Sequence, residues 1–421
     1  MKLYQQIAGP SRETVYQPDT DAQPEPRSAP ETVPMSSPDI SGAEIETVTQ
    51  VLRSRWLSMG PQIDAFEQSL ANYVGAAYAA GVNSGTSGLH LSLIAASVEP
   101  GDWVITTPFS FIASANCILY ERAVPIFVDV DLLTGNIDPE LVAEAACDLT
   151  RSPQAAQRWL PPALRQDPPP GRLKVLLPVH AFGQPADMDR LQITARLHNL
   201  TIIEDACEAI GAEYKGRRVG AHSDAAVFAF YPNKQITTGE GGMIVTKHEH
   251  WAELFRSLRN QGRDVFNAWL NHTRLGYNYR LDELSAALGK VQLQRLDDIL
   301  EKRAQVAAWY NERLAGLSGV QCPHIEATTT RMSWFVYVIQ LKPPINRDAV
   351  MAKLAEANIP SRPYFTPIHL QPFYQEKFGF QKGNYPITEQ LGERCLALPF
   401  SSVMTEAQVD YVSMMLKQYL G

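Results

Sequence analysis

The sequence of 421 residues contains only five cysteines, and their pattern excludes the usual structural roles of this residue. They are odd in number and scattered, without any Cys-x-x-Cys pair, at Cys117, Cys147, Cys207, Cys322 and Cys395. Zinc sites built from cysteine need closely spaced ligands, and a disulfide framework needs an even set. The sequence therefore predicts no disulfide framework and no metal site, and it favours a reducing, cytoplasmic compartment.

An excess of positive charge is also absent. The chain carries 37 Lys and Arg against 45 Asp and Glu, a net charge of −8. A general nucleic-acid surface would need an excess of basic residues, so we expect no nucleic-acid partner. No apolar run approaches the roughly 18 residues of a membrane span. Residues 1–6 lack the apolar core of an export signal, so we expect neither membrane insertion nor export.

Length and composition predict a soluble protein of about two or three structural units. Residues 1–34 are rich in Pro, Gln, Ser, Thr and acidic residues, which predicts a disordered or extended tail. The alternative is that this tail wraps across a dimer partner. Beyond it, β-rich runs at 103–107, 125–129, 175–179 and 225–228 alternate with helical patterns. This alternation predicts an α/β fold with a mostly parallel sheet and helices on both faces.

The most informative segment is Phe-Ala-Phe-Tyr-Pro-Asn-Lys-Gln-Ile-Thr-Thr-Gly-Glu-Gly-Gly at residues 228–242. Lys234 follows an aromatic, apolar run and precedes three glycines within four residues. Because burial disfavours the charged form of an amine, a lysine placed here can attack a carbonyl carbon. The glycines let the backbone approach a ligand closely. The pattern predicts a Schiff-base lysine, with a surface lysine that caps a turn as the alternative.

Asp205 ends a second informative segment, the apolar strand predicted at residues 202–205. It would lie at the carboxyl end of a buried strand, where ligand crevices open in α/β sheets. An aspartate beside a pyridine nitrogen keeps that nitrogen protonated, so the ring draws electrons from a carbanion. The alternative for a single Asp at a strand end is a helix N-cap.

A third segment, Asn-Ser-Gly-Thr-Ser-Gly at residues 83–88, opens an apolar helix. Gly85, Thr86 and Ser87 would offer backbone N–H groups, hydroxyls and the positive end of the helix dipole to a phosphate. The segment matches neither the P-loop nor the GxGxxG pattern, and ordinary helix capping is the alternative. Phosphate loop, ring-nitrogen Asp and lysine, in this order, together predict a site for pyridoxal 5′-phosphate (PLP).

With these residues in place, the chain resembles the DegT/DnrJ/EryC1/StrS aminotransferases, PLP enzymes that aminate nucleotide-linked keto-sugars. The matching stretches follow the family's order at 56–61, 84–86, 178–185, 204–206, 228–242, 276–280, 363–369 and 395–399. They cover the chain from about Pro38 to the C-terminus, and Lys234 separates it from the family's dehydratase branch, which carries histidine there. The resemblance implies the aspartate aminotransferase-like (type I) fold. A large PLP-binding domain would span 35–290 and a smaller C-terminal α/β domain 291–421.

The resemblance also implies individual roles. Lys234 would form the internal aldimine with PLP, and Asp205 would bind the pyridine nitrogen. Phe111 matches the aromatic side chain that stacks on one ring face, with plain core packing as the alternative. Cys207 would lie on the opposite face, where the family tolerates only a small side chain. Asn278 would reach the phosphate of the neighbouring subunit's cofactor, which implies a homodimer with shared active sites.

Two positions depart from the family pattern. Ala229 stands where the family commonly has a phosphate-binding serine, so one hydrogen bond, worth about 1.5–3 kcal/mol, is missing or comes from elsewhere. Glu208, expected at the cofactor, stands where many sugar aminotransferases carry Gln or His. The surrounding residues resemble the GDP-perosamine synthase branch, although similar strings appear across the family.

The implied activity is transfer of an amino group from glutamate to a nucleotide-linked keto-deoxysugar, in amino-sugar biosynthesis for a polysaccharide or an antibiotic. His180, Tyr364 and His369 are candidates for binding the substrate, each with a structural role as the alternative. Two other functions stay open. A cyclitol (keto-inositol) aminotransferase would share every cofactor motif, whereas a non-catalytic PLP-binding regulatory protein would not need the intact Lys234 and Asp205.

Two further segments carry expectations about shape alone. Residues 148–172 are rich in proline and longer than the family's usual connection, so we expect a surface loop. Residues 281–317 are rich in Ala, Leu, Gln, Glu and Arg and predict one long helix between the two domains.

Overall fold

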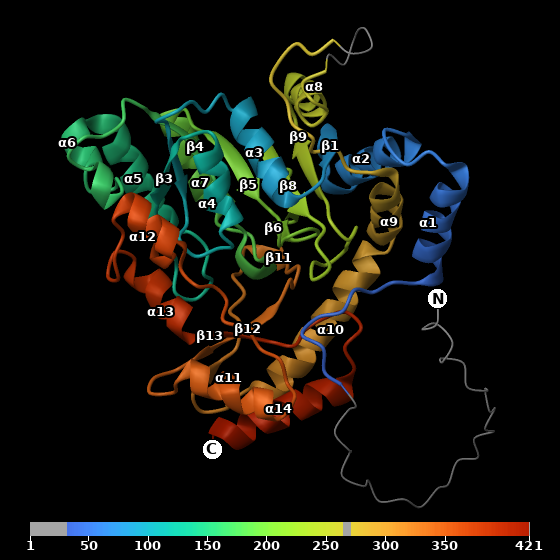
Figure 1. The fold of residues 1–421 in the computed structure, drawn as a ribbon. Helices are drawn as coiled ribbons and strands as arrows, with labels where there is room; N and C mark the ends of the chain where they lie inside the picture. Colours follow the sequence, from blue (N-terminus) through green and yellow to red (C-terminus); the bar gives the residue numbers. More distant parts are fainter. Residues whose placement is uncertain (1–31, 264–270, 421) are drawn as a thin grey trace, which may run out of the picture.

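The computed structural model describes residues 32–263 and 271–420, so nearly all of the tail predicted at 1–34 lies outside the described residues. Its centre is a seven-stranded sheet of order β1-β9-β8-β5-β4-β2-β3 (Figure 1). Strand β9 pairs antiparallel with β1 and β8, and the other neighbours are parallel. The strands are β1 (Tyr78–Val82), β2 (Trp103–Thr106), β3 (Val124–Phe127), β4 (Leu173–Leu176), β5 (Thr201–Asp205), β8 (Ala225–Ala229) and β9 (Gly242–Thr246). The predicted α/β fold with a mostly parallel sheet is confirmed.

Helices cover both faces of this sheet because successive side chains of each strand point to opposite sides. In β8, Ala226 and Phe228 pack toward α2 and α9, whereas Val227 packs toward α3 and α8. Helices α5 and α7 cover the other half of the first face. The helices of this part are α1 (Gly42–Ser54), α2 (Pro61–Val74), α3 (Gly85–Ala95), α4 (Ala113–Tyr120), α5 (Pro139–Arg151), α7 (Met188–His198), α8 (Glu249–Leu258) and α9 (Glu283–Gln294).

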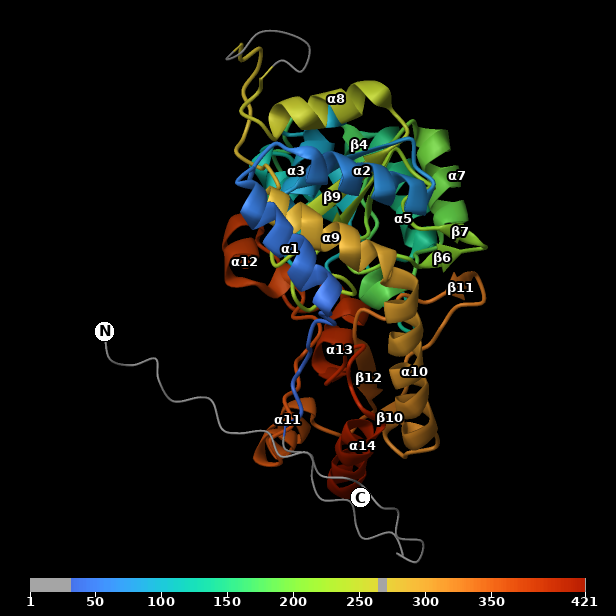
Figure 2. The ribbon, with the colours of Figure 1, turned by 90° about the vertical axis from the view of Figure 1, so that its right-hand side faces the viewer.

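A second, three-stranded antiparallel sheet of order β10-β12-β13 packs against α10, α11 and α14. Figure 2 shows α1, α2 and α9 facing the viewer and α10 leading from there toward β10 and α14. The third sheet joins β11 to β6 and β7. The remaining elements are β6 (Glu213–Tyr214), β7 (Arg217–Arg218), α10 (Leu296–Leu314), β10 (Val320–Gln321), β11 (Thr329–Arg331), β12 (Tyr337–Leu341), α11 (Arg347–Glu356), η3 (Ile368–Leu370), α12 (Pro372–Phe378), α13 (Pro386–Arg394), β13 (Cys395–Leu398) and α14 (Glu406–Leu420).

Both shape expectations need correction. The single helix predicted at 281–317 is interrupted at Arg295, between α9 and α10, where the Arg295 guanidinium bonds Asp39 and Glu44. The segment 148–172 is not merely a surface loop. It contains the end of α5, then α6 (Pro153–Ala156) and the short helix η1 (Pro162–Leu164), and Leu160 is buried in the core against α5 and α7.

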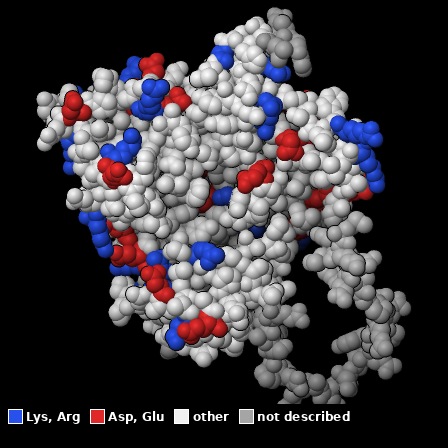
Figure 3. Space-filling view, viewed as in Figure 1, with Lys and Arg blue, Asp and Glu red and all other residues white. Residues whose placement is uncertain are grey.

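Residues 32–263 and 271–420 contain neither a membrane-spanning helix nor a candidate metal site. No helix there combines the length and apolar character that crossing a membrane requires. No group of three or more His, Cys, Asp or Glu side chains gathers there in a way that could hold a metal ion. On the face shown in Figure 3, basic and acidic side chains are interspersed around a broad uncharged area instead of forming a patch of one sign.

Candidate active site

A cavity of about 410 Å³ opens at the carboxyl ends of β4, β5 and β8. This is the edge at which open α/β sheets bind their ligands. The residues predicted from sequence that line it are Gly85, Thr86, Phe111, Asp205, Cys207, Glu208, Lys234 and Tyr364. Segments as distant in the chain as Gly85 and Tyr364 thus meet around one space. The ends of the parallel strands supply one side of it, and Tyr364 comes from the C-terminal part of the chain.

Lys234 lies in the turn that follows β8, where its backbone N–H donates to the carbonyl of Tyr231 at 2.9 Å. Its side chain is only 13% exposed. The Nζ atom lies 3.7 Å from Oε1 of Glu208 and 3.8 Å from the ring centroid of Phe335. The amine is therefore a cavity group, and the alternative of a surface lysine does not fit its position.

Asp205, the last residue of β5, is buried with its carboxylate held on both oxygens. The Ser114 hydroxyl donates to Oδ2 at 2.6 Å, and the backbone N–H of Cys207 donates to Oδ1 at 3.2 Å. Ser110 in turn contacts Ser114, with 2.8 Å between the hydroxyl oxygens. Ser110 and Ser114 line the cavity but were not predicted, because Ser114 and Asp205 lie 91 positions apart and no local pattern connects them.

Burial favours the neutral forms of two side chains near Asp205, the carboxyl group of Glu208 and the thiol of Cys207. Burial raises the pKa of Glu208 above its ordinary value, and the neighbouring Lys234 amine offsets this only in part. Its Oε2 accepts a hydrogen bond from the backbone N–H of Phe182 at 3.0 Å. Burial and the Asp205 carboxylate raise the pKa of Cys207 well above the usual value, so its thiol stays protonated and uncharged.

The first turn of α3 forms the other end of the cavity. Ser84 is the N-cap, and its hydroxyl accepts from the N–H of Ser87 at 3.1 Å. The Ser87 hydroxyl donates to Asn83, so Ser87 is engaged within the loop and does not line the cavity. The first N–H groups of a helix, here at Gly85 and Thr86, lack intrahelical acceptors and attract anions.

Close packing explains the glycine in this turn. A Cβ at Gly85 would lie 2.7 Å from the sulfur of Cys207 and 2.9 Å from the Cβ of Ala229. The residues that line the cavity therefore fit PLP, because they include helix N–H groups for a phosphate, a carboxylate for the ring nitrogen and a lysine amine. Phe111, which is 62% exposed at the cavity wall, is not a core residue.

The three predicted substrate contacts are placed differently. Tyr364 lines the cavity, and burial together with the Glu208 carboxylate raises the pKa of Tyr364 to about 12, so the hydroxyl stays protonated. His180 is fully buried, with Nε2 at 2.8 Å from Glu204 and Nδ1 accepting from the N–H of Ala186 at 3.0 Å.

His369 is also fully buried, with Nε2 at 2.9 Å from Glu389. The contacts of His180 and His369 match their structural alternative, because neither ring can reach a ligand in the cavity without breaking them. Asn278 is exposed, and its carbonyl accepts from the Asn83 amide at 3.4 Å. Asn278 thus lies beside the loop that opens α3, and its proposed contact with a neighbouring subunit stays a prediction.

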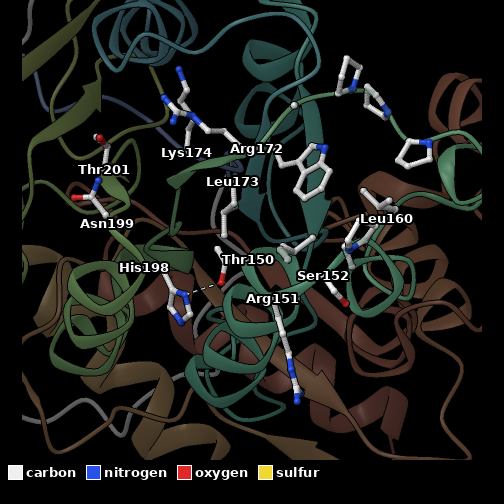
Figure 4. A pocket seen from close by; sticks show the side chains of 18 of the residues that line it. Thr150, Arg151, Ser152, Leu160, Arg172, Leu173, Lys174, His198, Asn199 and Thr201 are labelled. Carbon is white, nitrogen blue, oxygen red and sulfur yellow. Dashed lines mark hydrogen bonds between the residues drawn. The ribbon is translucent and has the colours of Figure 1, made fainter.

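A larger cavity, of about 780 Å³, lies at the opposite, amino edge of the sheet beneath the 148–172 segment (Figure 4). Arg172 and Lys174 lie side by side there, and Lys174 is paired with Asp102 at 3.2 Å. Arg151 and His198 belong to the last turns of α5 and α7, where cations offset the helix dipole. These basic residues have structural explanations, so the smaller cavity is the candidate active site.

Comparison with known proteins agrees with this geometry. The model of the DegT/DnrJ/EryC1/StrS aminotransferase family matches residues 38–417. The chain is 37% identical to GDP-perosamine synthase of Caulobacter vibrioides, over 92% of this chain and 98% of that protein. It is 35% identical to the spore coat polysaccharide biosynthesis protein SpsC of Bacillus subtilis, over 90% and 95%. The crystal structure of S. venezuelae DesV in complex with a ketimine intermediate superposes with a TM-score of 0.81 at 32% identity, covering 92% of this chain and 98% of DesV.

Proposed function

Because the chain belongs to the DegT/DnrJ/EryC1/StrS aminotransferase family, we propose that it transfers an amino group from glutamate to a nucleotide-linked keto-deoxysugar. Its class, a PLP-dependent sugar aminotransferase with the type I fold, follows from the family and from relatives such as GDP-perosamine synthase and DesV. The observation that carries the finer proposal is the meeting of Lys234, Asp205 and the first turn of α3 around one cavity.

The cofactor's position follows from the charges of the cavity. The N–H groups of Gly85 and Thr86 would bind its phosphate, and the Asp205 carboxylate would hold the proton of its ring nitrogen. Ser114 supports this role because a hydrogen bond donated to a carboxylate favours its charged form. When bound, PLP supplies an electron sink for the carbanion that forms at the donor's α-carbon.

Lys234 performs two tasks in this scheme. Its amine would be the nucleophile toward the carbonyl carbon of the cofactor. The Nζ atom, once free, would serve as the general base for the proton at the donor's α-carbon and then as the general acid that returns this proton. Glu208, 3.7 Å away, and Phe335 keep the amine inside the cavity during this transfer.

The acceptor is proposed from the relatives and from the walls of the cavity. The relative GDP-perosamine synthase is named for a nucleotide-linked amino sugar, and this supports a nucleotide-linked sugar as the acceptor. Tyr364, with its protonated hydroxyl at the cavity wall, is a proposed substrate contact. No observation favours the cyclitol alternative, and the intact Lys234 and Asp205 argue against a purely regulatory role.

We also propose that the protein is a cytoplasmic homodimer with shared active sites. Each subunit would consist of a large domain at 35–290 and a small domain at 291–421. Large apolar side chains are exposed at Trp56 (58%) and at Tyr231 (52%), which lines the cavity. Exposed apolar surface of this kind marks protein–protein interfaces. A partner subunit that covers it would bring its Asn278 to the phosphate end.

The test is a two-step reaction followed by absorbance. The PLP-loaded protein should lose its yellow colour when glutamate is added, and Lys234→Ala should show neither the colour nor the loss. A panel of nucleotide-linked keto-sugars and a keto-inositol should then be offered to the aminated form. Return of the yellow colour with a nucleotide-linked sugar supports the proposal. Return with the keto-inositol alone would replace it by the cyclitol reaction, and no response to glutamate would refute the proposed donor.

A further inference from the structure

Arg303 in α10 is a buried cation without a carboxylate partner among the described residues. Burial lowers the pKa of Arg303 to about 9, so the guanidinium still carries its charge at neutral pH. It donates from Nε to the carbonyl of Trp334 at 2.7 Å and from Nη2 to that of Phe335 at 2.8 Å. The guanidinium also lies over the ring of Phe400, 5.1 Å from the centroid. Burial of a charge without an opposite charge is costly, so the two bonds to consecutive carbonyls point to a specific task.

The segment that Arg303 holds is also tied to the turn that carries Lys234. The backbone N–H of Ser333 donates to the carbonyl of Gly183 at 3.1 Å, and that of Phe335 donates to Phe182 at 3.2 Å. Gln235, the neighbour of Lys234, donates through its amide to the Ser333 hydroxyl at 2.6 Å. The 333–335 segment is therefore fixed from three sides.

These hydrogen bonds fix the position of Phe335. Its ring is buried, lines the active-site cavity and presents its face to Nζ of Lys234, 3.8 Å from the ring centroid. The face of an aromatic ring attracts an ammonium ion, and the attraction grows where water is excluded. Each time the donor displaces Lys234, its amine must stay close to the reacting carbon while it holds a proton.

We propose that Phe335 holds the protonated amine of Lys234 at its place of action, and that Arg303 is a positioning residue that fixes Phe335 through the two consecutive carbonyls. This inference rests on the proposed role of Lys234 as the proton carrier. Only arginine has planar, correctly spaced donors for two neighbouring carbonyls, because a lysine ammonium offers a single point charge. The conservative change to lysine should therefore rescue function only in part.

The first experiment measures the Lys234 amine without cofactor or substrate. The apo protein is labelled with acetic anhydride over a range of pH, and modification of Lys234 is quantified by mass spectrometry of its peptide. The rate follows the neutral fraction of the amine. In Phe335→Leu, which keeps an apolar wall but removes the ring, the midpoint of this curve should fall by about 0.4–1.5 pH units. Phe127→Leu, a buried ring outside this cavity, is the control and should leave the midpoint unchanged.

The second experiment separates positioning from mere stability. Arg303→Met should shift the midpoint in the same direction as Phe335→Leu, and the double variant should add no further shift, because both changes remove one interaction. Arg303→Lys should lie between Arg303→Met and the wild type. An unchanged midpoint in Phe335→Leu would overturn the role of the ring even if no Arg303 variant folds. If the double variant showed the sum of the two single shifts, the role of Arg303 would be overturned. The same holds if Arg303→Met lowered the stability of the protein but left the midpoint unchanged. Since the labelling needs no glutamate, failure of the proposed donor reaction is a separate outcome.

Discussion

Ser114→Ala should weaken PLP binding, although Ser114 lies outside every motif of the sequence. Its hydroxyl is the side-chain donor to the Asp205 carboxylate, at 2.6 Å in a buried setting. A hydrogen bond to a charged group contributes about 1.5–3 kcal/mol. Because the role proposed for Asp205 requires its ionised form, losing this bond should raise the dissociation constant of PLP about 10- to 150-fold.

The assay is titration of the apo protein with PLP, followed by absorbance. Ser413→Ala, the same change at a buried serine of α14, is the matched control and should bind PLP like the wild type. In the background Asp205→Asn, Ser114→Ala should have little further effect, because its acceptor has lost its charge. A PLP affinity that is unchanged in Ser114→Ala would refute the idea that this bond supports the Asp205 carboxylate.

Two further predictions concern buried acid groups. Burial raises the pKa of Glu208, so this group favours the folded state below the ordinary range of a glutamate and loses that contribution as the pH rises. Relative to the wild type, the free energy of unfolding of Glu208→Gln should therefore rise as the pH increases above the ordinary range of a glutamate, because only the wild type loses this contribution. Thermal unfolding of both proteins over a range of pH measures this difference, and a difference that stays constant with pH would contradict this sign. His180→Ala should lower the free energy of unfolding by up to about 3–5 kcal/mol in urea titrations, since the buried Glu204 loses the His180 ring and keeps only hydrogen bonds from Ser223 and Gly220. A raised KM for the sugar with unchanged stability would instead restore His180 as a substrate contact.

The residues that the sequence identified best are those whose positions are fixed by local structure. Asp205 ends a buried strand, and Gly85 opens a helix. Lys234 follows the end of β8, the neighbour of β5 in the sheet. The parallel pairing of β5 with β8 brings Asp205 and Lys234 to one edge. Because pattern alone predicts strand ends and helix starts, these residues could be assigned before any coordinates.

What the sequence could not predict depends on contacts between distant segments. Ser114 meets Asp205 across 91 positions, and Arg295, where the helix is interrupted, bonds Asp39 and Glu44 about 250 positions earlier in the chain. His180 lies in a stretch that resembles the family, but its ring points into the core. A motif fixes where a residue stands in the chain and leaves the direction of its side chain to the tertiary packing.

The proposed function depends most directly on Lys234 as the residue that attaches the cofactor. The most direct measurement is reduction of the PLP-loaded protein with borohydride, followed by mass spectrometry of its peptides. We predict that the trapped cofactor is found on the peptide containing Lys234 and is lost in Lys234→Ala. A trapped cofactor on another lysine, or none at all, would contradict the account.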